Sequence, residues 1–132
     1  MIESKDISFI SVENQSQGFP KHVHETFCIS LIRSGIEKIE LESDFLYSDQ
    51  QCISITNPYE VHANPLVDKD VKTSFDTIYI SPELMASVGK QKMEFLTRQI
   101  QDPQLNQSFS LLLESLKTGE SQQADLLLMS FV

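Results

Sequence analysis

The chain has 132 residues, which is enough for one domain with a buried core. Ten lysine and arginine residues against nineteen aspartate and glutamate residues give a net charge of −9, and a surface this acidic repels phosphate, which argues against direct binding of DNA or RNA. No apolar run is long enough to span a membrane and the N-terminus lacks the pattern of a secretory signal, so we expect a cytoplasmic location.

The first part of the chain, up to Ser81, has the pattern of short β-strands. Apolar residues come in short runs separated by turn-forming residues, as is typical of strands. Residues 18–20 are expected to break the chain after the first strand, and residues 57–65 to form a loop before the last. The expected strands cover residues 7–12, 24–32, 36–41, 45–47, 52–56 and 71–80. Many short strands with frequent turns favour a sandwich or a barrel.

The part after Ser81 has helical periodicity. Ser81 is a cap-type residue, Pro82 stands at the first helical position, and Gly89 can end the helix that they begin. Apolar residues at helical spacing over residues 93–100 predict a second helix.

A third helix is expected between the pair Asp102-Pro103 and Gly119, by the same capping logic. Its apolar residues form one continuous stripe of Leu105, Phe109, Leu112 and Leu116. This stripe can cover the outer face of the strands, but its width favours self-association. We therefore predict a twofold dimer with these four residues at its interface.

A further helix is expected over residues 122–132, and the chain stops inside this apolar segment. Apolar residues at the end of a helix need a surface to bury against. We therefore expect the chain to be part of a longer protein whose missing part lies C-terminal.

Three histidines are the residues best suited to carry chemistry. His22 and His24 are two positions apart, so on a strand both imidazoles face the same side. His62 follows a proline turn after a different strand, and it converges on the first two if the barrel closes. Three neutral imidazoles in one concave site suit a divalent metal such as Zn, Ni, Cu or Fe.

The segments that carry these histidines resemble two motifs of the cupin family. GFPKHVHE at residues 18–25, followed by Gly35, is similar to the first cupin motif, and NPYEVHAN at residues 57–64 is similar to the second. Together with IYISPEL at residues 78–84, these two motifs form a pattern that is more specific than the general cupin pattern. It resembles the N-terminal ligand-binding and dimerisation domain of AraC-family transcription regulators, over residues 18–88 by motif and over residues 90–132 by helical layout.

This resemblance implies a mostly β fold, a cupin barrel (a double-stranded β-helix or jelly roll) followed by α-helices. Residues 1–81 would form the ligand-sensing barrel, and residues 82–132 the helical dimerisation and linker region. The resemblance further implies a sensor that binds a small-molecule effector in the barrel and is not an enzyme. DNA would be contacted only by a C-terminal helix-turn-helix domain, which this chain does not contain.

The sequence departs from metal-binding cupins at one position. Those proteins usually carry a glutamate four or five residues after the second histidine, where this chain has Cys28 and Ile29. Three roles of the histidines therefore stay open: structural hydrogen bonding, contact with an organic effector, or binding of a metal by His22, His24 and His62. The rival function is a small metal-dependent cupin enzyme, a dioxygenase or an isomerase, that uses these three ligands.

The strand after His24 predicts the wall of the ligand site. Phe27, Ile29 and Leu31 occupy the face opposite to the histidines. Small side chains on the histidine face leave volume unfilled, which suits a polar metabolite. The predicted ligand-binding residues are His22, His24, Thr26, Cys28, Ser30 and His62.

Overall fold

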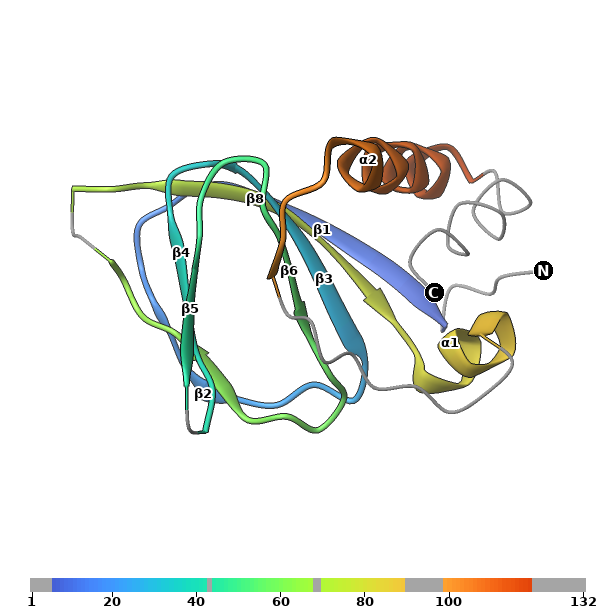
Figure 1. Ribbon diagram of the computed structural model, residues 1–132, viewed down its shortest axis with the longest axis horizontal. Helices are drawn as coiled ribbons and strands as arrows, with labels where there is room; N and C mark the ends of the chain where they lie inside the picture. The colour runs from blue at the N-terminus through green and yellow to red at the C-terminus, as the bar shows by residue number, and fades with distance from the viewer. Residues whose placement is uncertain (1–5, 43, 68–69, 90–98, 120–132) are drawn as a thin grey trace.

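Two β-sheets face each other in the computed structural model, which describes residues 6–42, 44–67, 70–89 and 99–119 (Figure 1). The strands are β1 (Ile7–Gln15), β2 (Phe19–His22), β3 (Phe27–Ser34), β4 (Glu37–Glu40), β5 (Phe45–Ser48), β6 (Ile53–Thr56), β7 (His62–Asn64), β8 (Thr73–Ile80) and β9 (Gln99–Ile100). The helices are α1 (Pro82–Gly89) and α2 (Pro103–Thr118). Both helices lie on the outer side of one sheet.

The chain alternates between the two sheets as it proceeds. One sheet has the order β1-β8-β3-β6-β9, the other has the order β2-β7-β4-β5, and all their strand pairs are antiparallel. Strands close in sequence, such as β1 and β2 or β7 and β8, therefore fall in different sheets. This is the jelly-roll arrangement that the sequence predicted, although within the described residues the strands pair as two separate sheets and not as one closed cylinder.

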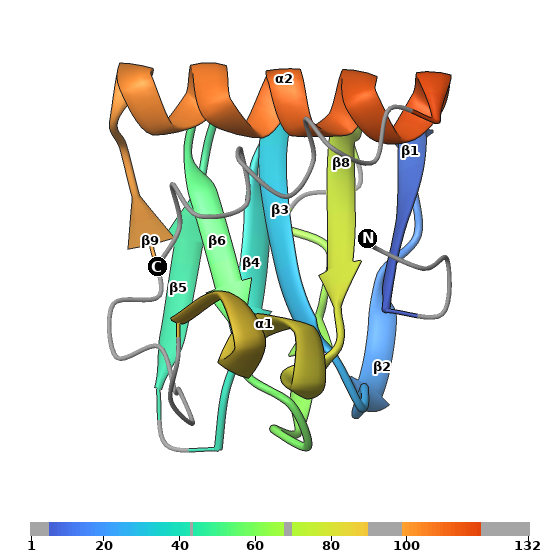
Figure 2. The same ribbon diagram turned by 90° about the vertical axis from the view of Figure 1, so that its right-hand side faces the viewer.

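The hydrophobic core lies between the five-stranded sheet and the helices, outside the space between the sheets. Phe27 and Ile29 of β3 point to this side and are 1% exposed, and Met85 of α1 and Phe109 of α2 pack against them at 0%. In Figure 2, α2 crosses one end of the strands β6, β3, β8 and β1, and α1 lies across the other end. The helices are therefore part of the same folded unit as the strands.

The apolar stripe of α2 faces this core. Phe109 and Leu112 are fully buried in it, and Leu105 and Leu116 pack against its edge. The large apolar side chain that α2 exposes to solvent is instead Leu111, at 50% exposure. The stripe is used within the chain because the outer face of the sheet is itself apolar. A dimer contact through Phe109 and Leu112 would require them to leave the core, and self-association stays a prediction.

The predicted helix boundaries at Ser81, Asp102 and Gly119 are confirmed. The Ser81 hydroxyl accepts a hydrogen bond from the amide of Leu84 at 3.1 Å, and the Asp102 carboxylate accepts one from the amide of Gln104 at 3.0 Å. Gly119 ends α2 with a φ of 79°, a left-handed conformation that favours glycine. Neither described helix is long and apolar enough to cross a membrane.

Three expectations about secondary structure are wrong. Residues 19–22 form β2 where a break was expected, which is possible because β2 is an edge strand and tolerates Pro20. Residues 62–64 form β7 inside the expected loop. The helix expected over residues 93–100 ends in a strand, because Gln99–Ile100 adds β9 to the edge of the sheet beside β6. The first part of that segment, and the helix expected over residues 122–132, lie outside the described residues.

Candidate functional site

A cavity of about 340 Å³ lies between the two sheets, on the side away from the helices. Its walls combine apolar side chains with hydroxyl groups, three imidazoles and one carboxyl group. The lining residues are Ile10, Phe19, Pro20, His22, His24, Cys28, Ser30, Glu37, Ile39, Ser54, Thr56, His62, Asn64, Phe75, Thr77 and Tyr79. A volume of this size suits a small organic molecule.

Strand pairing explains which side chains reach the cavity. Ser30 of β3 lies directly opposite Thr77 of β8 on one side and Ser54 of β6 on the other. Since partners in adjacent strands point to the same face of a sheet, all three face the cavity together. The hydroxyl groups of Ser30 and Thr77 are 2.6 Å apart and hydrogen-bonded. The opposite face of the same strands holds the apolar core, as predicted for Phe27, Ile29 and Leu31.

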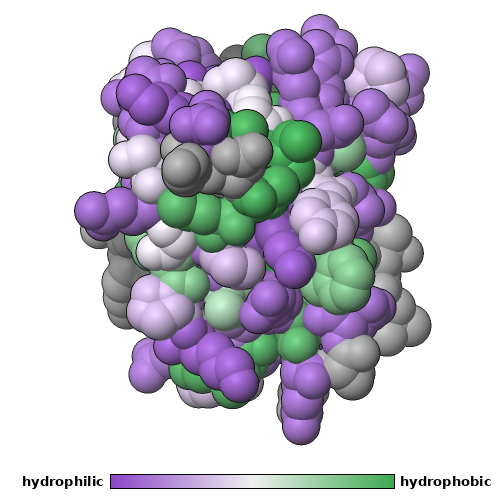
Figure 3. Space-filling view, turned by 90° about the vertical axis from the view of Figure 1, so that its left-hand side faces the viewer, coloured by the Kyte–Doolittle hydropathy of each residue, from purple (hydrophilic) through white to green (hydrophobic). Residues whose placement is uncertain are grey.

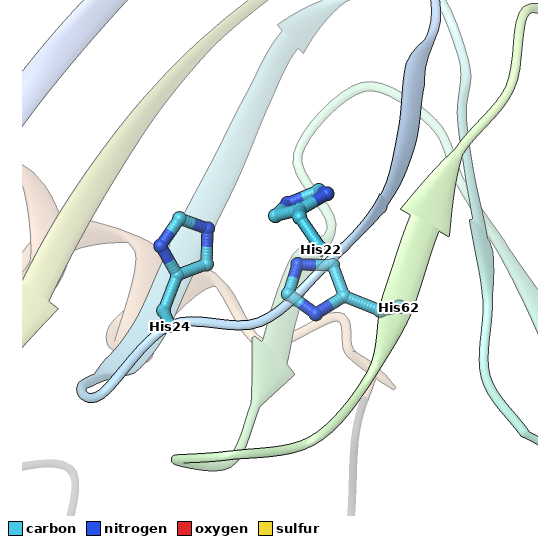
Figure 4. A group of neighbouring side chains, drawn as sticks. All are labelled: His22, His24 and His62. Atoms are coloured by element: carbon cyan, nitrogen blue, oxygen red, sulfur yellow. The ribbon is translucent and has the colours of Figure 1, made fainter.

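The three histidines gather at one part of the cavity (Figure 4). The ring centroids of His22 and His62 are 4.2 Å apart, those of His22 and His24 4.9 Å, and those of His24 and His62 5.5 Å. The sequence predicted that His22 and His24 face the same side because both lie on one strand. This was partly wrong, because His24 lies in the connection between β2 and β3. That connection nevertheless turns the His24 ring toward the other two. His22 and His62 are register partners in the β2–β7 pair.

Backbone carbonyl groups fix the orientation of two of these rings. Nδ1 of His22 lies 2.7 Å from the carbonyl oxygen of Pro20, and Nδ1 of His62 lies 3.0 Å from that of Glu60. Because a carbonyl oxygen only accepts hydrogen bonds, each Nδ1 carries the proton and donates. The other ring nitrogen, Nε2, is then left with its lone pair, as in most histidine ligands of metals.

Burial keeps two of the imidazoles neutral. It lowers the pKa of His24 below the ordinary value of 6.5, and the neighbouring charge of His22 lowers it further. Burial also lowers the pKa of His62, with smaller effects of His22 and His24 in the same direction, against the hydrogen bond to the Glu60 carbonyl, which raises it. Both side chains are therefore largely uncharged at neutral pH, the form that binds metals.

The donor set fits a divalent metal ion. One possible ligand atom from each of His22, His24 and His62 lies within 4.8 Å of the others. Among the described residues, no carboxylate joins this cluster. At the two positions where metal-binding cupins carry their glutamate, Cys28 lines the cavity and Ile29 points into the core. A metal bound here would have three imidazole ligands from the protein.

Glu37 is a cavity residue that the sequence analysis missed. It lies on β4, across the cavity from the five-stranded sheet, and its carboxylate accepts a hydrogen bond from the Ser54 hydroxyl at 3.1 Å. Burial raises the pKa of Glu37 to about 7, and the hydrogen bond from Ser54 lowers it by less. The alternation of β4 could have indicated it, because Glu37 and Ile39 line the cavity while Lys38 contacts the Phe45 and Tyr47 rings.

Tyr79 and Cys28 are two further ionisable residues of the cavity, and both are uncharged at neutral pH. Burial raises the pKa of Tyr79 to about 12, and the nearby Cys28 raises it further. Burial likewise raises the pKa of the Cys28 thiol. Both residues sit in one row of the sheet, since Cys28 pairs with Tyr79.

The predicted ligand-binding residues are placed as follows. His22, His24, Cys28, Ser30 and His62 line the cavity. Thr26, which precedes β3, is not among the residues that line it.

Comparisons with known proteins agree with this architecture. The family described as "AraC-like ligand binding domain" matches residues 4–132. A Ralstonia eutropha protein provisionally named a mannose-6-phosphate isomerase has a similar structure, with a TM-score of 0.54 at 15% identity over 61% of this chain and 80% of that chain. No curated protein sequence matches the chain.

Two further solved structures identify the fold. A Klebsiella pneumoniae protein with a double-stranded β-helix domain has a TM-score of 0.51 at 16% identity, over 60% of this chain and 70% of that one. A Shewanella frigidimarina protein that contains a cupin-2 domain has a TM-score of 0.50 at 15% identity, over 60% and 74%. These likenesses confirm the predicted cupin fold.

Proposed function

Because the chain belongs to the family of AraC-like ligand binding domains, we propose that it senses a small-molecule effector in the cavity between its two sheets and controls a transcription regulator. The observation that carries this proposal is the cavity itself. A space of about 340 Å³ is bounded by apolar walls and by a few polar groups that point inward, which is the usual composition of a small-molecule site.

The five-stranded sheet offers a route by which the effector acts on the rest of the protein. One face of β3 presents Cys28 and Ser30 to the cavity, and its other face packs Ile29 into the core that contains Phe109 of α2. An effector that binds one arrangement of this sheet better than another shifts the equilibrium between them. The position of α2 changes with that equilibrium, and α2 leads toward the C-terminal side of the chain (Figure 2).

In this proposal binding energy performs the function, without a chemical step. The DNA-contacting part is a helix-turn-helix domain C-terminal to residue 132, and two copies of the regulator associate as a homodimer in the cytoplasm. The acidic charge of this segment, −9, supports a division of labour in which DNA is bound elsewhere.

A second candidate function rests on the histidine cluster. His22, His24 and His62 fit a divalent metal, which would supply a Lewis acid within the cavity. In that case the chain would be a metal-dependent cupin enzyme, with His22 and His62 holding their Nε2 atoms in place through their Nδ1 hydrogen bonds. The chain's own contribution would be to orient these ligands and to keep His24 and His62 neutral.

The full-length protein decides between the two functions. Its coding sequence is expected to continue beyond Val132 into a pair of helix-turn-helix motifs, and its affinity for its own promoter DNA, measured by fluorescence anisotropy, should change when a cavity ligand is added. A continuation without such motifs, or turnover of the ligand in place of an effect on DNA, would move the assignment to the enzyme.

A further inference from the structure

Glu37 supplies the one carboxylate among the residues that line the cavity. Its neighbours on the strand are directed elsewhere, because Lys38 contacts two aromatic rings and forms an ion pair with Glu40 at 3.6 Å. Glu37 and Ile39 thus form the part of β4 that faces the space between the sheets.

Two hydroxyl groups of β6, those of Ser54 and Thr56, line the same cavity as this carboxylate. Ser54, opposite it on β6, donates to Oε1 at 3.1 Å and is the one hydrogen-bond partner of the carboxyl group within the described chain. In the same sheet, the buried hydroxyl Oγ1 of Thr56, which neighbours the Cys28 thiol, has no hydrogen-bond partner of ordinary geometry. A buried polar group without a partner is costly, so a ligand that supplies one is favoured there.

Among the described residues, no lysine or arginine lines the cavity to balance the charge of Glu37. An effector with a carboxylate or phosphate group would therefore bring a second negative charge next to Glu37 without a lysine or arginine to pair with.

A protonated amine meets the requirements of this part of the cavity. An ammonium group offers three N–H donors and a positive charge, which no lysine or arginine of the described cavity wall supplies. A neutral hydroxyl offers one donor and no charge, and hydrogen bonds between two charged groups are about twice as strong as neutral ones. The apolar side chains of Ile10, Ile39 and Phe75 suit a hydrocarbon part of the same molecule.

We propose that Glu37 is the specificity-determining residue of the cavity and that the effector is a small compound with a protonated amine, held between Glu37 and the hydroxyl groups of Ser54 and Thr56. This inference rests on the proposed effector-binding function, because it names the chemical class that the same cavity accepts. Burial raises the pKa of Glu37 to about 7 because it disfavours the charged form of the carboxyl group, and a bound ammonium group would stabilise that form.

The test uses two sets of matched probes: benzylamine, benzyl alcohol and benzoate, and glucosamine, glucose and glucuronate. Isothermal titration calorimetry measures their affinity for the purified chain in the presence of EDTA, because a metal at the histidines would add positive charge to the same cavity. Chemical-shift changes at Ser54 and Thr77 amides report whether a probe lies in the cavity. Glu37→Gln removes the charge with little change in shape, and Glu40→Gln, on the same strand but outside the cavity, is the matched control.

At least one amine is expected to bind in the cavity more tightly than its alcohol and its carboxylate. Glu37→Gln should weaken the amine about tenfold or more, as for loss of one hydrogen bond between charged groups, and should leave the alcohol nearly unchanged. Glu40→Gln should leave both affinities unchanged.

Two results would overturn the inference. One is that neither amine binds, or that an alcohol or carboxylate binds in the cavity as tightly as its amine. The other is that Glu37→Gln leaves the affinity for the amine unchanged. Neither result contradicts the proposed function, which fails separately if a broad screen of metabolites finds no ligand of the cavity.

Discussion

His22 and His62 face each other across the β2–β7 pair, with their ring centroids 4.2 Å apart and each Nδ1 held by a backbone carbonyl group. The strands β2 and β7 thus fix the orientation of the Nε2 atoms of His22 and His62, and the connection from β2 to β3 brings His24 next to them. The arrangement predicts that the chain binds Ni²⁺ or Co²⁺ at neutral pH.

His62→Ala removes one of the three ligands and should lower the affinity for the metal. The loss should exceed the roughly 10- to 100-fold that follows when a ligand loses only its hydrogen-bond partner. Calorimetric titration of the metal, with elemental analysis of the purified chain, measures this. His62→Gln serves as a second variant with a side chain of similar reach. A chain that takes up no metal, or a His62→Ala variant with unchanged affinity, would assign the histidines to structure or to the effector.

The same histidines predict a loss of stability in mild acid. The pKa values of His24 and His62 in the folded chain lie below 6.5, so the unfolded chain takes up protons first as the pH falls. Their contribution to stability is present above about pH 6.5 and is lost as the pH falls below it. Urea denaturation at a series of pH values should show a smaller decline below pH 6.5 in His62→Gln than in the natural chain. Equal declines would mean that His62 is not buried as described.

The contribution of Glu37 to stability has the opposite dependence on pH. Its pKa rises from 4.5 to about 7 on folding, so its contribution is fully present below pH 4.5 and is lost as the pH rises toward 7. Glu37→Gln should therefore be more stable than the natural chain above pH 7, by up to about 3 kcal/mol, with the difference vanishing near pH 4. The free energy of unfolding in urea measures it, with Glu40→Gln as the control that shows no such trend.

Helix α2 offers a matched pair of leucines. Leu112 is fully buried against the sheet, whereas its neighbour Leu111 is 50% exposed. Leu112→Ala should destabilise the chain by about 2–5 kcal/mol, and Leu111→Ala by less than about 0.5 kcal/mol. Analytical ultracentrifugation of both variants also tests self-association. If the Leu112→Ala chain stays folded but no longer forms a dimer, the apolar stripe of α2 takes part in a dimer interface.

The sequence predicted the architecture well where periodicity is strong. The strand expected over residues 71–80 and the capping signals at Ser81 and Asp102 correspond to β8, α1 and α2. It failed at the short strands β2, β7 and β9, because two to four residues carry too little periodicity to outweigh a nearby proline or a helical spacing. Those strands are formed by pairing with partners distant in the chain.

The candidate site was only partly predictable for a related reason. Cys28 and Ser30 follow from alternation along one strand, but Ser54 and Thr77 are placed beside them by the register of β6 and β8. Alternation puts Glu37 on the same face of β4 as Ile39, but does not say which face is turned inward. Glu37 also looks like an ordinary surface residue in a strand of alternating lysine, isoleucine and glutamate. Which side of β4 faces inward depends on how the two sheets pack, and that is a property of the whole fold.

The central claim, that the cavity holds a small effector, is tested most directly by comparing the natural chain with a variant whose cavity is partly filled. Cys28 lines the cavity, and its sulfur lies 4.0 Å from the hydroxyl and carbonyl oxygens of Thr26 and near the hydroxyl of Thr56. Because hydrogen bonds of a thiol are weak, Cys28→Leu adds volume without removing a strong one. A thermal-shift screen of sugars, amines, aromatic acids and other small metabolites first finds a ligand. Calorimetry should then show that it binds the natural chain with one-to-one stoichiometry and binds Cys28→Leu about tenfold more weakly or not at all. A ligand that binds both chains equally would contradict the account.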